Sequence, residues 1–153
     1  MKKLLQKLLV LSGILLICLV KIHGQSTTKE ITDKFFALYA SDPAKAIEYG
    51  FSNNKWMAQK PDDVDNLKNK LKTLIGIIGD YYGYELLSEK TAGSNIKMVT
   101  YIVRYDREPV RFSFFFYKPK DKWQLNNFSY DENIDNDLEE ASKTYRLKEN
   151  FGL

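Results

Sequence analysis

Cysteine and histidine are nearly absent from this sequence of 153 residues, which has one of each, Cys18 and His23. Both lie in the first 24 residues, which we interpret as a signal peptide. Residues 25–153 then contain neither type, so we expect no disulfide, no thiol nucleophile, no Ser-His-Asp triad and no metal site built from Cys or His. No cofactor is indicated. Export without cysteine favours a bacterial envelope protein over a small disulfide-stabilised module.

The first 24 residues have the order of features typical of a secretory signal peptide. Three lysines precede an apolar run from Leu8 to Val20, and the small Gly24 precedes Gln25, where the composition becomes polar. The run is short for a transmembrane helix, which needs about 20 apolar residues. Two alternatives remain: an uncleaved anchor, and a lipid anchor on Cys18, although Ile17 is not the small residue that lipoprotein processing needs. We expect a periplasmic or secreted protein without stable membrane insertion after cleavage.

The positive net charge belongs to this segment. The chain has 23 Lys and Arg against 20 Asp and Glu, and four of the lysines but no acid precede residue 25. Residues 25–153 therefore carry 19 basic and 20 acidic side chains, a formal net charge of −1. This balance gives no reason to expect a nucleic-acid partner. The 129 remaining residues suit one domain with its own core.

Helix signals occupy the first half of this domain. Thr27 and Glu30 form a capping box that begins a helix ending near Ala40. Asp42 followed by Pro43 begins a second, short helix that stops at Gly50. A third and longest helix begins at Pro61, and its apolar residues share one face: Val64, Leu67, Leu71, Leu74, Ile75 and Ile78.

Three residues near the long helix carry further expectations. Trp56 and Met57 lie in an irregular segment before it, and we expect them to anchor that segment to the core. Gly76 lies inside the helix, where glycine costs up to ~1 kcal/mol relative to alanine, so we expect close packing on the sheet there.

Lys97 to Tyr117 is the strongest strand signal, two runs of β-branched and aromatic residues around a turn at Asp106-Arg107. Centring the turn there places one set of side chains on a core face: Val99, Tyr101, Val103, Val110, Phe112, Phe114 and Phe116. The opposite face is mixed: Met98, Thr100, Ile102, Arg104, Arg111, Ser113, Phe115 and Tyr117. A one-residue slip would bury both arginines, so the register should be well fixed.

Two more strands and a last helix complete the predicted fold. Residues 84–91 form a first strand, and residues 123–130 form a fourth. Alternation in the fourth breaks at Asn126-Asn127, which indicates either a β-bulge or a strand that contributes to both faces; we favour the bulge. A final helix begins near Asn136, with Glu139 completing a second capping box. The fold class is therefore α+β, with N-terminal helices packed on a curved four-stranded antiparallel sheet and a C-terminal helix.

The phrases GDYYGYELLSEK and VTYIVRYDREPVRFSFFFYKPKDKWQLNNFSYDENI resemble small secreted bacterial domains of unknown function in the cystatin-like, nuclear transport factor 2-like superfamily. The resemblance covers roughly Ile31 to Leu138 and implies a cone-shaped sheet around the long helix. Steroid isomerases, dehydratases and transport factors share this fold, so the resemblance leaves the function open.

Three local patterns are weak candidates for chemistry. Residues 131–137 begin like a calcium loop, but Asn136 stands where glycine is needed and Ser142 where the bidentate glutamate is needed. Residues 80–85 could supply an acid and a phenol to an isomerase-type site. Asn127-Phe128-Ser129 matches a glycosylation pattern within a strand. We assign no catalytic and no metal-binding residue, and expect no enzyme activity.

The mixed face of the hairpin is the predicted functional surface. Apolar side chains ringed by polar ones are typical of contact surfaces. We expect it to bind a second copy, giving a homodimer, or another envelope protein, unless the last helix, with Leu138, Tyr145 and Leu147, folds back over it. The alternatives are a carrier of small apolar ligands or, less favoured, an isomerase-like enzyme. The predicted interaction residues are Met98, Ile102, Arg104, Arg111, Phe115 and Tyr117.

Overall fold

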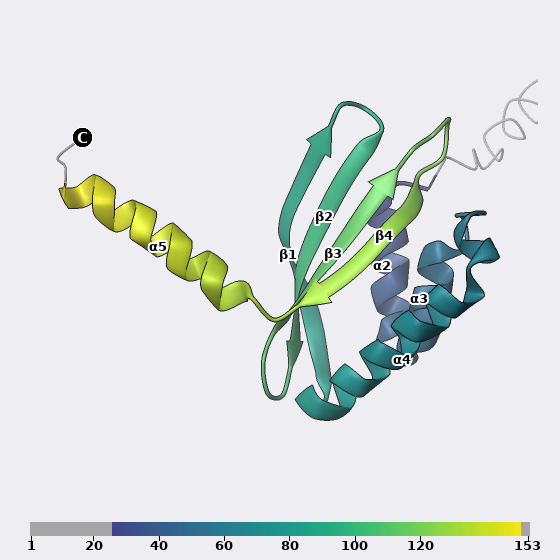
Figure 1. Ribbon diagram of the computed structural model, residues 1–153, viewed down its shortest axis with the longest axis horizontal. Coiled ribbons are helices and arrows are strands. Elements are labelled where there is room, and N and C mark those ends of the chain that lie inside the picture. The colour runs from purple at the N-terminus through teal and green to yellow at the C-terminus, as the bar shows by residue number, and fades with distance from the viewer. Residues whose placement is uncertain (1–25, 151–153) are drawn as a thin grey trace, which may run out of the picture.

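The computed structural model describes residues 26–150, so the predicted signal segment lies outside the described residues. Within this range the chain is α+β, with three α-helices, a four-stranded sheet and a last α-helix (Figure 1). In chain order the elements are α2 (Thr28–Tyr39), α3 (Pro43–Phe51), the 3-10 helix η1 (Met57–Gln59), α4 (Pro61–Ile78), β1 (Tyr81–Ala92), β2 (Ile96–Tyr105), β3 (Val110–Tyr117), β4 (Gln124–Asp131) and α5 (Ile134–Asn150).

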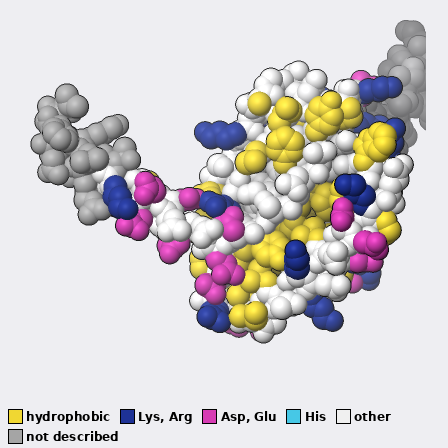
Figure 2. All heavy atoms as spheres, in the orientation of Figure 1, with side chains coloured by type: hydrophobic (Ala, Val, Ile, Leu, Met, Phe, Trp, Pro, Cys, Tyr) yellow, Lys and Arg dark blue, Asp and Glu magenta, His cyan; other side chains and the backbone are white. Residues whose placement is uncertain are grey.

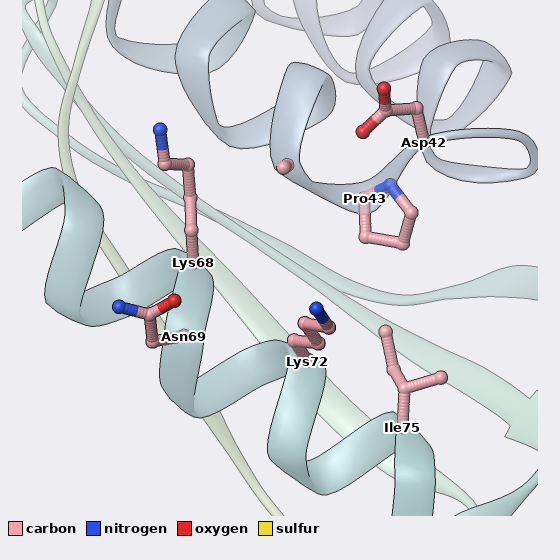
Figure 3. Close-up of a pocket in the computed structure, with 7 residues that line it drawn as sticks. Asp42, Pro43, Lys68, Asn69, Lys72 and Ile75 are labelled. Atoms are coloured by element: carbon pink, nitrogen blue, oxygen red, sulfur yellow. The ribbon is translucent and has the colours of Figure 1, made fainter.

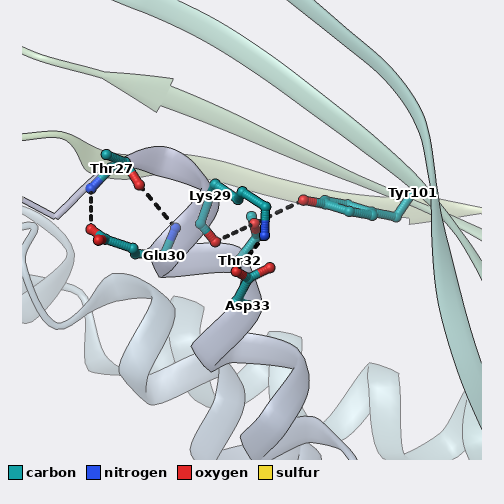
Figure 4. Close-up of polar contacts among 6 residues, drawn as sticks. All are labelled: Thr27, Lys29, Glu30, Thr32, Asp33 and Tyr101. Carbon is teal, nitrogen blue, oxygen red and sulfur yellow. Dashed lines mark hydrogen bonds and ion pairs between the residues drawn. The ribbon is translucent and has the colours of Figure 1, made fainter.

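Local signals fix the starts of the first two helices as predicted. The Glu30 amide donates to Thr27 Oγ1 at 3.1 Å and the Thr27 amide donates to Glu30 Oε2 at 2.7 Å, which completes the capping box (Figure 4). The Asp42 carboxylate accepts from the Lys45 amide at 3.0 Å and so caps α3. These side chains satisfy amides that the first helical turn leaves without partners.

The sheet is an antiparallel meander in the order β1-β2-β3-β4. The predicted register is confirmed, because Val103 pairs with Val110, and Tyr101 pairs with Phe112. The predicted bulge is also confirmed: Phe115 pairs with Asn127 and Phe116 with Leu125, which leaves one residue of β4 unpaired. The bulge returns Leu125 and Phe128 to the same buried side despite their odd spacing.

The core lies between the helices α2, α3 and α4 and the inner face of the sheet. Every predicted core residue of the hairpin is buried. The rings that meet Phe112 and Phe114 come from α2: Phe35 lies 4.9 Å from Phe114, and Tyr39 lies 5.4 Å from Phe112, between ring centroids. The aromatic rings against Phe112 and Phe114 thus come from the first helix, while Leu71 and Ile78 of the long helix are buried in the same core.

Several local predictions were wrong. Trp56 is 60% exposed, with the Lys55 ammonium over its ring, so it does not anchor its segment. Met57 does pack against the core, as predicted, and the buried Asn54 also holds the segment by donating from Nδ2 to the Leu125 carbonyl at 2.9 Å. Gly76 faces open space, so no close packing explains it. The last helix begins at Ile134, so Asn136 lies inside its first turn and is not its N-cap. The first strand begins at Tyr81, three residues before the expected start.

The helices are distributed unequally over the two sides of the sheet. Helices α2, α3 and α4 all lie on one side, and α5 projects away from the rest of the fold on the other (Figure 1). Among residues 26–150, no helix combines the length and apolar character that crossing a membrane requires.

Candidate interaction face on the outer side of the sheet

The candidate site is the outer face of β2 and β3, the side turned away from α2. Alternation along the strands places cross-strand pairs on it: Ile96 with Tyr117, Met98 with Phe115, Thr100 with Ser113, and Ile102 with Arg111. Arg104 follows at the end of β2. We call this set, with Arg104, the outer face. All six predicted interaction residues therefore lie on one surface.

One end of the outer face is apolar. Met98 is 43% exposed and Tyr117 is 39% exposed, whereas Phe115 and Ile102 are half-buried. Thr100, which pairs with Ser88 and Ser113 on the same face, is buried although it points away from the core. The result is a shallow apolar surface with a small polar belt in its middle.

The other end is cationic and already engaged with acids. Arg111 donates a hydrogen bond from Nε to Asp131 Oδ2 at 3.1 Å and forms an ion pair with the same carboxylate, with Nη2 2.8 Å from Oδ1. It also contacts Asp137 in α5. The Asp131 hydrogen bond is the main cause that raises the pKa of Arg111 above its ordinary value. Arg104 pairs more loosely with Glu85, at 3.5 Å between Nε and Oε1, and more than half of its side chain is exposed. Both arginines of the outer face are therefore paired with acids of the same chain, Arg111 more closely than Arg104.

The inner face of the sheet is filled by side chains at its centre. Phe112, Phe114 and Phe116 are at most 1% exposed, and Tyr101 is 6% exposed. Thr32 and Tyr101 join their hydroxyls at 2.8 Å across the core (Figure 4), and Tyr39 and Tyr105 do so at 2.5 Å. Burial raises the pKa of Tyr105 to about 12 and that of Tyr39 still further, so all these phenols stay protonated. Sequence reasoning missed these pairs, because nothing local marks which tyrosine meets which helix residue.

Two of the hollows beside the long helix have volumes of about 460 Å³ and 510 Å³. The smaller lies between α4 and β4, lined in part by Leu74, Ile77 and Tyr130; Figure 2 shows hydrophobic side chains gathered between these elements. The other lies between the start of α3 and α4, where Lys68 and Lys72 lie across from Pro43 (Figure 3).

The charge in the second hollow is largely compensated. Lys68 Nζ lies 2.8 Å from Glu48 and 2.7 Å from Asp65. Those hydrogen bonds, Asp65 first, raise the pKa of Lys68 to about 12. An anionic ligand would therefore compete with two carboxylates already in place.

The predicted acid–phenol cluster is not brought together. Tyr82 and Asp80 lie at the surface, where the Tyr82 hydroxyl and, at 3.1 Å, the Asp80 amide donate to the Asp106 carboxylate. The Tyr82 hydrogen bond is the main cause that lowers the pKa of Asp106, opposite to the raised pKa of an isomerase-type carboxyl. Tyr81 and Tyr84 point instead toward the rings of the core.

The acids of residues 131–137 also diverge. Asp131 and Asp137 both bind Arg111, and Asp135 Oδ1 accepts from the Asn136 amide at 2.9 Å. Among the described residues, no group of three or more His, Cys, Asp or Glu is arranged to hold a metal ion.

Comparison of the chain with protein-family models, with curated proteins and with solved structures finds no match.

Proposed function

We propose that this chain is an exported, non-catalytic domain that acts by protein contact through the outer face of its sheet. The observation that carries the proposal is the contrast between the two faces: rings fill the inner one, while the outer one leaves Met98 and Tyr117 about 40% exposed. Apolar side chains gathered beside charged ones are characteristic of contact surfaces. The basic start and short apolar run of the first 24 residues support export.

The proposed fold family is the cystatin-like, nuclear transport factor 2-like group. Its support is the order of elements, with helices preceding a four-stranded meander, together with the sequence resemblance. An aromatic cone closed by α2 is consistent with a member that has no ligand cavity. The function does not depend on this assignment, because the outer face is defined by its own residues.

The test places a charge at the centre of the outer face. Phe115→Lys puts an ammonium between Met98 and Asn127, and the matched control Ile77→Lys puts the same charge on α4, where Ile77 is 58% exposed. Self-association is measured by light scattering, and partners are captured from an envelope fraction with each variant. We expect Phe115→Lys to lose binding and Ile77→Lys to keep it, with both folds intact by circular dichroism.

Two results would contradict the proposal. One is a folded Phe115→Lys variant that retains every partner of the unaltered chain, including a second copy. The other is an equal loss of binding in the Ile77→Lys control.

A second candidate is a carrier of small apolar ligands, favoured by the hollow of about 460 Å³ between α4 and β4. Titration of an apolar fluorescent probe tests it. Ile77→Lys should then weaken probe binding, whereas Phe115→Lys should leave it unchanged.

A further inference from the structure

Both tryptophans of the chain lie at the same end of the sheet. Trp123 directly precedes β4, and Trp56 is held nearby because Asn54, two residues before it, donates from Nδ2 to the Leu125 carbonyl at 2.9 Å. Lysines of the connection between β3 and β4, together with Lys55, accompany the two rings. We call this set the basic end: Lys55, Trp56, Lys118, Lys120, Lys122 and Trp123.

The lysines of the basic end are not paired with acids. Among residues 26–150, none of the four takes part in an ion pair, whereas Lys97, at the start of the neighbouring β2, pairs with Glu89 at 2.7 Å. Two of the ammonium groups lie over the rings instead: Lys118 Nζ is 5.0 Å from the centre of the Trp123 ring, and Lys55 Nζ is 4.8 Å from that of Trp56. Positive charge and aromatic surface therefore lie side by side.

The positive charge of the basic end is local. Four lysines stand there against one acid in the same turn, Asp121, although residues 25–153 as a whole carry a formal net charge of −1. Residues 131–140, at the end of β4 and the start of α5, hold six acids and no base. Figure 2 shows acidic side chains gathered around the start of α5. A negatively charged surface would therefore attract the basic end and repel the opposite one.

The N-terminal segment joins the domain at the basic end. Thr32 meets Tyr101 at 2.8 Å between hydroxyls, and Tyr39 meets Tyr105, so α2 runs in the direction of β2 and begins where β2 begins (Figure 1). The apolar run of residues 8–20 precedes α2. A chain still held in a membrane by that run presents the basic end to the bilayer.

We infer that the basic end binds reversibly to the surface of an anionic lipid bilayer, with its lysines at the lipid phosphates and its tryptophan rings among the headgroups. Lysines are attracted to anionic lipid surfaces, and tryptophan favours the interface between water and hydrocarbon. A soluble polyanion needs the lysines alone, whereas Trp56, 60% exposed, fits the apolar part of the interface as well. The contact goes beyond the proposed function, because the outer face is centred on Phe115.

Vesicle binding tests the lysines. The exported protein, in the form in which the cell processes it, is sedimented with phosphatidylglycerol vesicles and with phosphatidylcholine vesicles. We expect binding to the anionic vesicles that falls at high salt. Lys120→Gln/Lys122→Gln should weaken it roughly 20-fold, because each lysine near an anionic surface contributes about fivefold. The control Lys70→Gln/Lys72→Gln removes the same charge from exposed positions of α4 and should change binding less than about twofold.

Tryptophan fluorescence tests the orientation. Brominated lipids in the anionic vesicles should quench the emission, and because both tryptophans belong to the basic end, quenching reports on that end even in a chain anchored by its first residues. Trp56→Ala should weaken vesicle binding but leave binding to soluble polyphosphate unchanged. Ile77→Ala, which removes a similarly exposed apolar side chain from α4, should leave both unchanged.

The inference is overturned by equal binding to the two kinds of vesicle, by binding to neither, or by binding that does not fall at high salt. It is also overturned if Lys120→Gln/Lys122→Gln, folded by circular dichroism, binds as the unaltered chain does. Polyphosphate binding without quenching by the brominated vesicles would assign the basic end to a soluble polyanion instead. None of these results bears on the loss of partners in Phe115→Lys, which tests the proposed function separately.

Discussion

Two consecutive phenylalanines on opposite faces of β3 allow the packing to be tested with a matched pair. Phe114 is 1% exposed, and its ring meets Phe35 at 4.9 Å, Phe128 at 5.1 Å and Tyr101 at 5.8 Å. Phe115 points to the outer face and is half-buried. We therefore expect alanine to be much more damaging at position 114 than at position 115.

The magnitude follows from burial. Truncating a fully buried phenylalanine to alanine loses the free energy of transferring the ring out of water and leaves a cavity. Together these cost about 3–5 kcal/mol of stability. The rings around Phe114 come from α2, β2 and β4, so they cannot all move in to fill the space. At Phe115 the lost burial is partial and solvent fills the gap, so we expect about 1–2 kcal/mol. Against a domain stability of about 5–15 kcal/mol, Phe114→Ala removes a large share.

Urea denaturation followed by tryptophan fluorescence measures the difference. With an m-value of about 2 kcal/mol/M, Phe114→Ala should lower the midpoint by about 2 M and Phe115→Ala by less than about 1 M. Both should be measured at two protein concentrations, because a dimer makes the midpoint concentration-dependent. Equal losses in the monomeric state would refute the assignment of the two faces.

Three further predictions concern single contacts. Tyr39→Phe should cost about 1–3 kcal/mol by leaving the buried Tyr105 hydroxyl unpaired, and Tyr39→Phe/Tyr105→Phe should cost less than that single change in the same urea assay. Gly76→Ala should raise the free energy of unfolding by up to ~1 kcal/mol, because alanine favours the helix and its Cβ would meet no other atom within 4 Å. Gly79→Ala should lower the free energy of unfolding, because φ is +87° and the new Cβ would lie 2.7 Å from the Asp106 carboxylate. Folding lowers the pKa of Asp106 below 3.8, so the Asp106 carboxylate stabilises the fold above that pH, and this stabilisation is lost as the pH falls through the folded pKa. The difference in unfolding free energy between the unaltered chain and Asp106→Asn should therefore shrink to zero in urea titrations at acid pH. A difference that stays constant with pH would show that the hydrogen bonds to the Asp106 carboxylate do not cause it.

The sheet could be predicted from sequence because its side chains alternate regularly and because a shift in register would bury charged residues. A slip of one residue would bury Arg104 and Arg111, so the alternation of β2 and β3 specifies the register by itself. The same holds for the capping box of α2, where Thr27 and Glu30 act within one turn. Each of these features depends on residues close in sequence or on a long periodic run.

Which elements of the chain pack against each other could not be predicted in this way. The stripe of α4 shows that one side is apolar, but not that α2 supplies the rings against Phe114. Trp56 is large and apolar, yet it lies in an irregular segment without periodicity, and the small polar Asn54 holds that segment instead. Which distant element covers a surface is a property of the whole fold and leaves no local signal.

The same limit applies to the candidate site. The alternation predicted the members of the outer face, but not that Arg111 would reach Asp137 and so join the face to α5. The outer face is not needed to complete the core, since α2, α3, α4 and the inner face of the sheet already form it. Polar residues at Met98, Tyr117 and Leu138 would therefore cost a lone domain little. The exposed apolar residues Met98 and Tyr117 are therefore available for the contact that we propose at the outer face.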